Sequence, residues 1–161
     1  MDNELKSRLL RFMSLCDDMN DRLFADEQGR LRKEVNNDLI SYLSYLIFSD
    51  RVVSGREVDC INYYFDKQFS EDDIRAFYVS DGEEISVPMS LVYFVRIDND
   101  IFTENETVST LSEELVNLYK GLGMEMICSD KTLAITEFKD YEEYISMMET
   151  YKSAYLKCMA E

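Results

Sequence analysis

The sequence predicts an all-α fold, a compact bundle of about seven helices, on three observations. Apolar residues recur at helical spacing almost throughout the chain, as they do on the buried faces of helices. The 161 residues include one proline and five glycines, which argues against a loop-rich β fold. A turn between two expected helices also recurs later in the chain, so the bundle should contain two pseudo-symmetric helix–turn–helix units.

The helices of the first half have apolar faces or start signals. Ser54 and Glu57 form a capping box that begins a third helix. Ser70 begins a short fourth helix, because the acids that follow it favour the positive end of a helix dipole. The stretch from Asn20 to Lys33 is expected to join the first helix to the repeat-bearing core. The apolar face of the first helix comprises Leu5, Leu9, Phe12, Met13 and Cys16. That of the second helix, which ends near Asp50, comprises Leu39, Ile40, Leu43, Leu46 and Ile47. That of the third comprises Val58, Ile61 and Phe65.

Three further helices are expected in the second half. Pro88 suits the first turn of one, Thr110 with Glu113 forms a capping box before the next, and Thr136 caps the last. The acidic stretch Asp98–Glu106 lacks the glycine and the final glutamate of an EF-hand, so it is expected to be a loop between helices. The apolar faces are Leu91, Val92, Phe94 and Val95; Leu111, Leu115, Leu118, Leu122 and Met126; and Phe138, Tyr141, Ile145 and Met148.

The repeated turn aligns residues 47–57 with residues 127–137 without gaps. Both copies keep Ser-Asp, a basic residue, an apolar residue and then a Glu. We therefore expect similar units at about residues 39–65 and 119–145, with residues 1–35 as an N-terminal helical extension, in one domain spanning 1–161. Val53 and Leu133 should be buried at equivalent points of the two units.

The charge balance limits the partners. With 33 acidic and 17 basic residues, the formal charge is −16, which repels nucleic acid and suits basic protein surfaces or cations. The four cysteines form no CxxC pair and no histidine is present, so buried free thiols are expected rather than a zinc site. The chain starts without a signal-peptide pattern and has no apolar run of membrane-spanning length, so we expect a cytoplasmic protein with no direct membrane span.

Two acidic corners are the candidate metal ligands, Asp50 with Glu57 and Asp130 with Glu137. An Asp that ends one helix and a Glu that opens the next can place two carboxylates on one side of a tight turn, where a hard cation binds. Helix capping is the competing explanation, because Ser54 already accounts for Glu57 and a calcium site needs about six or more ligands.

An acidic face for a basic partner is the second candidate site. Gathered on one side, its carboxylates would steer a basic protein in a salt-dependent way; scattered, they would serve solubility only. The tyrosine-rich helices are the alternative contact surface, because tyrosine is favoured at interfaces. The acidic face comprises Asp98, Asp100, Asp140, Glu142 and Glu143.

The two corners resemble the recurring motif of the tellurite-resistance TerB-like superfamily, which also includes the N-terminal region of a membrane-anchored DnaJ-type co-chaperone. Residues 48–57 resemble one copy and residues 122–137 the other, within a resemblance that covers roughly residues 36–155. The resemblance implies an acidic, metal-associated scaffold in stress-response, ATPase-associated or membrane-linked assemblies. Arg51 and Lys131 replace the Gly that follows each Asp in the family pattern, and their charges compete with a metal, so metal binding should be weak or absent.

These observations predict a non-enzymatic acidic interaction domain, without a cofactor, whose partner has a basic surface. A divalent-cation sensor that uses the four corner acids is the alternative. A small carboxylate-dependent enzyme has the least support, because the sequence has no histidine, phosphate-binding glycine loop or nucleophile elbow.

Overall fold

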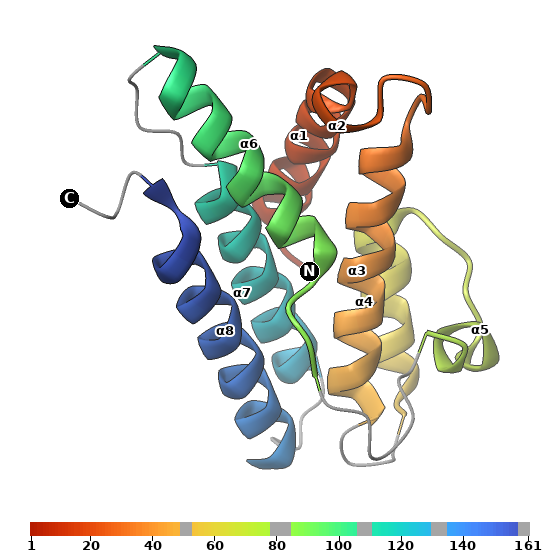
Figure 1. Ribbon diagram of the computed structural model, residues 1–161. Coiled ribbons are helices and arrows are strands. Elements are labelled where there is room, and N and C mark those ends of the chain that lie inside the picture. Colours follow the sequence, from red (N-terminus) through yellow and green to blue (C-terminus); the bar gives the residue numbers. More distant parts are fainter. Residues whose placement is uncertain (49–52, 78–84, 106–110, 130–134, 158–161) are drawn as a thin grey trace.

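A computed structural model describes residues 1–48, 53–77, 85–105, 111–129 and 135–157 (Figure 1). These residues form helices and no strand, which confirms the predicted all-α class. Two of the helical segments, α2 and α5, have only 4 and 5 residues. The segments are α1 (Asn3–Met19), α2 (Asp21–Phe24), α3 (Arg30–Ile47), α4 (Gly55–Phe65), α5 (Glu71–Arg75), α6 (Met89–Asn105), α7 (Leu111–Ser129) and α8 (Ile135–Tyr155).

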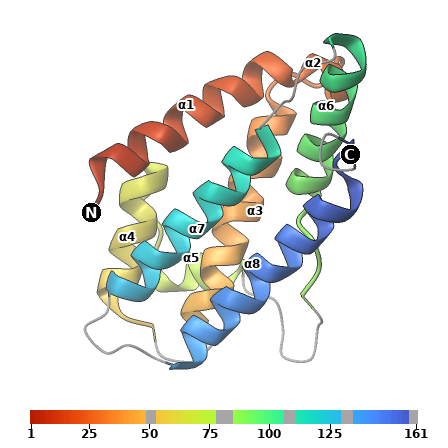
Figure 2. The same cartoon turned by 90° about the vertical axis from the view of Figure 1, so that its left-hand side faces the viewer.

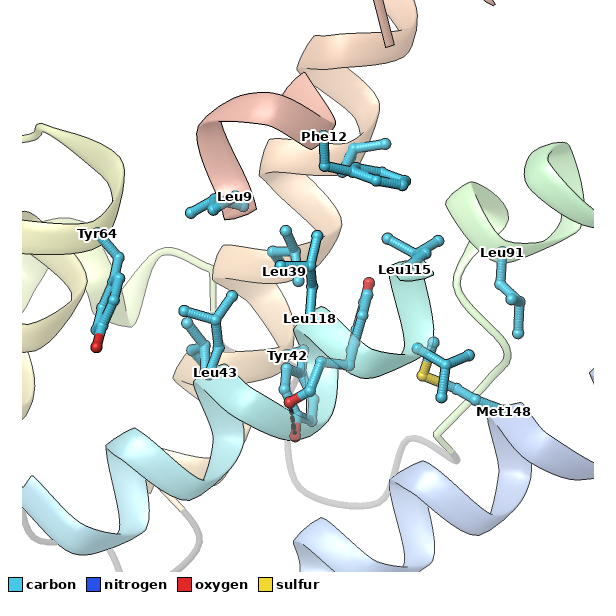
Figure 3. Close-up of a cluster of buried hydrophobic side chains, with 14 of the residues drawn as sticks. Leu9, Phe12, Leu39, Tyr42, Leu43, Tyr64, Leu91, Leu115, Leu118 and Met148 are labelled. Carbon is cyan, nitrogen blue, oxygen red and sulfur yellow. Dashed lines mark hydrogen bonds between the residues drawn. The ribbon is translucent and has the colours of Figure 1, made fainter. Parts of the chain in front are cut away.

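Helix α7 is the centre of the bundle. It packs against α1, α3, α4, α6 and α8, and Figure 2 shows it between α1 and α8 with α3 behind. Its buried residues recur at i, i+3 and i+4 spacing and make one broad buried side of the helix, opposite exposed residues such as Glu113 and Met124. They are Ser112, Leu115, Val116, Leu118, Tyr119, Leu122, Gly123, Met126 and Ile127. Figure 3 shows core side chains from α1, α3, α7 and α8 converging around this helix.

Several predicted helix faces and starts are confirmed. The five apolar residues proposed for the first helix are all buried in α1. Ser54 and Glu57 form the predicted capping box of α4, and Ser70 caps α5, where Asp73 completes a second box. Cys16 and Cys60 are buried as expected, whereas Cys128 is exposed at the end of α7.

The stretch from Asn20 to Lys33 joins α1 to the core as expected, although its last residues already belong to α3. Helix α3 begins at Arg30, well before the apolar face expected for the second helix, and Gly29 precedes it with a φ of 76°. The buried side chain of Asn20 organises the connection. Its Nδ2 donates to the carbonyl oxygens of Phe24 and Glu27 (3.0 and 2.9 Å), and its Oδ1 accepts from the Leu31 amide (2.9 Å).

The expected acidic loop at residues 98–106 is wrong, because α6 continues as helix to Asn105. Asp98 therefore occupies a helical position from which it caps the next helix. Its carboxylate accepts hydrogen bonds from the Leu111 amide (3.2 Å), the Ser112 amide (2.8 Å) and Ser112 Oγ (2.6 Å). Thr110, the residue predicted to cap this helix, lies outside the described residues.

Two predictions for the last helix fail as well. Helix α8 begins at Ile135, so Thr136 lies inside the helix rather than before it. Phe138, expected on the inner face, is 37% exposed, while Met148 is fully buried.

The contacts among the four helices of the proposed repeat have a symmetric pattern. Helix α3 packs on α4 and α7 on α8; α3 also packs on α7, α4 on α7 and α8 on α3. This set is unchanged when α3 is exchanged with α7 and α4 with α8. Val53 is half-buried and Leu133 lies outside the described residues, so the superposition of 39–65 on 119–145 stays a prediction.

Tyrosines attach α8 to the bundle. The ring of Tyr144 lies 4.7 Å from that of Tyr42 and 6.2 Å from that of Tyr119, centroid to centroid. Tyr42 Oη donates to the Tyr119 carbonyl oxygen on α7 at 3.0 Å (Figure 3). None of the helices in the described part of the chain has the length and apolar run needed to cross a membrane.

Candidate interaction site

The predicted metal corners are only partly described. Glu57 is fully buried, and its Oε1 accepts a hydrogen bond from the Ser54 amide (3.0 Å) while its own amide donates to Ser54 Oγ (3.2 Å). The capping role expected for Glu57 is therefore present. Glu137 is 2% exposed, and Asp50 and Asp130 lie outside the described residues.

No group of three or more potential metal ligands occurs among the residues that the structure describes. Since two of the four corner acids, Asp50 and Asp130, lie outside those residues, the hypothesis of a divalent cation stays a prediction. Glu57 and Glu137 share one feature: at equivalent positions of the repeat, both carboxylates lie inside the protein.

The predicted acidic face separates into residues with different environments. Glu142 and Glu143 are exposed on α8, and Asp140 is half-buried one turn before Glu143. Asp100 is exposed on α6. Asp98 does not belong to the face, because it is 1% exposed and caps α7.

The wider acidic surface is not gathered on one side either. The exposed acids at the start of α5 lie across the bundle from α8 (Figure 1). Among the described residues proposed for the face, the exposed carboxylates of α8 and α6 are the candidates for a shared surface.

A groove of about 830 Å³ runs along the outer side of α8. Glu142 and Glu143 line one end, Met147 and Tyr151 lie in the middle, and Tyr155 lines the other end. The walls are the two rows of residues at i, i+4 spacing on this side of the helix. Val87, which precedes α6, also lines the groove.

Helix α8 thus has apolar residues on two sides. Met148 is fully buried and the ring of Tyr144 packs in the core, so the inner side is covered. On the outer side, Met147 and Tyr151 are half-buried and Tyr155 is 60% exposed. Apolar groups gathered in a shallow groove with charges at one end are compatible with a contact surface for a partner.

In the described part of the chain, ion pairs neutralise the carboxylate of Glu149 on α8 but not those of Glu142 and Glu143. Glu149 forms ion pairs with Lys120 (2.9 Å) and Lys152 (3.4 Å). Burial raises the pKa of Glu149, but these two cations outweigh it and the pKa is lowered. Within the described ranges, neither Glu142 nor Glu143 forms an ion pair, so their charges remain available to a partner.

The acidic end of the groove is electrostatically strained. Partial burial raises the pKa of Asp140, and the negative charge of Glu143 raises it further. A cation placed beside these carboxylates would relieve their repulsion, because an opposite charge favours the ionised form. The acidic end is therefore built to favour a positively charged group.

A second groove, of about 290 Å³, continues from the first toward α6. Tyr151 and Tyr155 line both grooves, and their rings lie 4.6 Å apart. Arg96, Asp100 and Lys157 line the far end of the second groove. The tyrosine stripe along the last helix is the signal in the sequence for this surface. Met147 has no such signal, because the neighbouring Met148 is the methionine that fits the buried stripe.

No protein-family model, no curated protein and no solved structure matches this chain.

Proposed function

We propose that the chain is a non-enzymatic, acidic interaction domain of TerB-like type that binds a basic protein partner at the α8 groove. The observation that carries the proposal is the pair Glu142 and Glu143: both are exposed, without ion pairs among the described residues, at the end of a groove with an apolar floor. Apolar contacts supply affinity in such a site, and the charges supply orientation and speed of association.

The surroundings proposed for the domain follow from its resemblance. The symmetric contacts of α3, α4, α7 and α8 and the Ser54–Glu57 cap support a TerB-like arrangement. We accordingly propose a cytoplasmic domain whose partner belongs to a stress-response, ATPase-associated or membrane-associated assembly. Purification of the tagged protein from its native cells, followed by mass spectrometry, would identify that partner.

Charge reversal tests the proposed site. Glu142→Lys/Glu143→Lys should abolish capture of the partner, and capture by the wild type should weaken steeply as salt rises, because a Debye length is only about 10 Å at 0.1 M. Asp18→Lys/Asp26→Lys is the matched control, since it makes the same charge change at two exposed sites near the α1–α3 connection. The proposal is contradicted if capture of the partner is the same at low and high salt and in Glu142→Lys/Glu143→Lys. It is also contradicted if the control variant reduces capture as much as the α8 variant does.

A divalent-cation sensor is the second candidate. The burial of both Glu57 and Glu137, which occupy equivalent repeat positions, is the observation that favours it. Calorimetric titration with calcium, magnesium and manganese separates the two candidates. If the chain is an interaction domain, titration with these ions should give no saturable heat of binding. Micromolar binding of an ion that is lost in Asp50→Ala would establish a sensor.

A further inference from the structure

We infer that the two adjoining grooves form one docking site for an amphipathic helix that carries lysine or arginine at one end and carboxylates at the other. The inference rests on the proposed function and adds the shape and charge polarity of the partner. Its basis is the sharing of Tyr151 and Tyr155, which makes one continuous surface from the acidic end of α8 to α6.

Asn99 fastens one end of the surface. Asn99 Nδ2 donates to the Tyr155 carbonyl oxygen (2.9 Å), and Asn99 Oδ1 accepts from the Lys157 amide (2.8 Å). One side chain of α6 thereby fastens the end of α8 at the point where the two grooves meet. A site that exists before the partner arrives avoids the cost of ordering it on binding.

The dimensions suit a short helix. From Glu142 to Tyr155 the surface follows α8 for about 20 Å, at a rise of about 1.5 Å per residue, so a partner helix of about 14 residues would cover it. The rows 142–146–150–154 and 143–147–151–155 are ridges at i, i+4 spacing, between which the side chains of a second helix can pack. A peptide helix in a groove is read through apolar anchors with the same spacing.

The charges differ at the two ends. Glu142 and Glu143 make the first end negative, with Asp140 beside them. At the other end, Arg96 and Lys157 outnumber Asp100, and all three are exposed. A helix with separated charges therefore matches both ends only when its basic end lies over Glu142 and Glu143.

A second copy of this chain is a poor occupant of the same surface. Each copy carries a formal charge of −16, so two copies repel one another. A uniformly basic peptide fits only half of the surface, because it meets Arg96 and Lys157 at the far end.

Two synthetic peptides of about 14 residues test the inference. Both contain leucines at i, i+4 spacing and the same numbers of lysines and glutamates. In the polarised peptide the lysines stand at one end and the glutamates at the other; in the control peptide they are mixed along the helix. Fluorescence-anisotropy titration of the full chain should give an affinity for the polarised peptide that is higher by about tenfold or more, since several exposed charge pairs are gained.

Reversal of each end of the groove makes the test specific. Glu142→Lys/Glu143→Lys or Arg96→Glu/Lys157→Glu alone should weaken binding of the polarised peptide by about tenfold. All four substitutions together should restore binding, because the peptide can then dock in the opposite direction. A photo-crosslinker at the lysine end should label the surroundings of Glu143 in the wild type and those of residue 157 in the fourfold variant. Circular dichroism spectra verify that each variant folds.

The outcomes separate this inference from the proposed function. Equal affinity for the two peptides, or no recovery in the fourfold variant, overturns the inference, while salt- and Glu142-dependent capture of the native partner would leave the proposed function standing. If peptide binding does not depend on charge polarity and capture of the native partner does not depend on salt or on Glu142, both the inference and the proposed function are overturned. Self-association of the protein, measured by sedimentation and abolished by Glu142→Lys, would replace the peptide helix with a second copy and so also overturn the inference.

Discussion

Replacement of Gly123 by alanine should destabilise the protein, although alanine is the better helix former. Gly123 is buried in α7 where α3 and α8 meet it. A Cβ atom at this position would overlap the hydroxyl of Tyr42 and lie only 2.7 Å from Tyr141 Cδ2. Tyr42 Oη is held in place by its hydrogen bond to the Tyr119 carbonyl oxygen, so it cannot withdraw without losing a buried interaction.

The magnitude follows from three opposing contributions. Overpacking of a core costs about 1–3 kcal/mol. Displacement of the Tyr42 hydroxyl forfeits a hydrogen bond worth about 1 kcal/mol. Alanine returns about 1 kcal/mol through its higher helix propensity. The free energy of unfolding of Gly123→Ala should therefore fall by about 2 kcal/mol.

Gly121→Ala is the matched control, two residues away in the same helix. Its Cβ would meet only the end of the Leu5 side chain, with Cδ1 at 2.9 Å, which can rotate aside. We expect this variant to match or exceed wild-type stability, by up to about 1 kcal/mol. Urea unfolding followed by circular dichroism measures both variants.

Removal of the Tyr42 hydroxyl identifies the cause. In a Tyr42→Phe background, Gly123→Ala should cost about 1 kcal/mol less than it does in the wild type, since one of its two clashes is gone. Equal stability of Gly123→Ala and Gly121→Ala, or a double-mutant coupling near zero, would refute the steric argument.

Three other predictions concern capping, thiol reactivity and pH. Asp98→Asn should lower the free energy of unfolding by about 1–3 kcal/mol in urea titrations, because an amide group would then face backbone donors; exposed Asp100→Asn should have almost no effect. Iodoacetamide at about pH 8 should label exposed Cys128 in the native protein and spare Cys60, whose thiol pKa burial raises to about 12; peptide mass mapping measures this. Burial also raises the pKa of Asp38, and this effect outweighs the hydrogen bonds from Ser90 that lower it. The folded protein therefore binds the Asp38 proton more tightly than the unfolded chain does. The resulting stabilisation is complete below the ordinary pKa of an aspartate and is lost as pH rises through the raised pKa. Asp38→Asn should remove that loss. The difference in unfolding free energy, wild type minus variant, should therefore fall as pH rises above the ordinary pKa of an aspartate.

The sequence was a sufficient guide where the structure depends on neighbours along the chain. The capping box of Ser54 and Glu57 involves residues three apart, and the buried stripe of α1 repeats at helical spacing. Both features can be read locally because their partners lie within one turn.

Predictions failed where a distant residue decides the structure. Asp98 reads as part of an acidic loop, but its carboxylate caps a helix that begins 13 residues later. The start of α3 depends on the side chain of Asn20, which bonds to Leu31 across an irregular connection. Neither bond has a signature in the local pattern of apolar residues.

The candidate site shows the same limit in another form. Helix α8 carries two apolar stripes, and periodicity alone does not say which of them faces the core. Phe138 shows a further limit: it continues the stripe of Tyr141, Ile145 and Met148, yet it is 37% exposed in the first turn of α8, so periodicity does not say how far along the helix the core contact extends. The groove at Met147 and Tyr151 became recognisable only when packing against α7 and α3 had selected the other stripe as the buried one.

The tyrosines that attach α8 also give the molecule an optical property. The chain has no tryptophan and eleven tyrosines, so its ultraviolet emission comes from phenol rings. Tyr42, Tyr119 and Tyr144 lie against one another at the junction of α3, α7 and α8, and burial raises the pKa of each phenol. Detachment of α8 would pull one ring from this group and admit water to the other two. Their emission and absorbance therefore form a built-in signal of whether the helix that carries the groove is seated, without any added label.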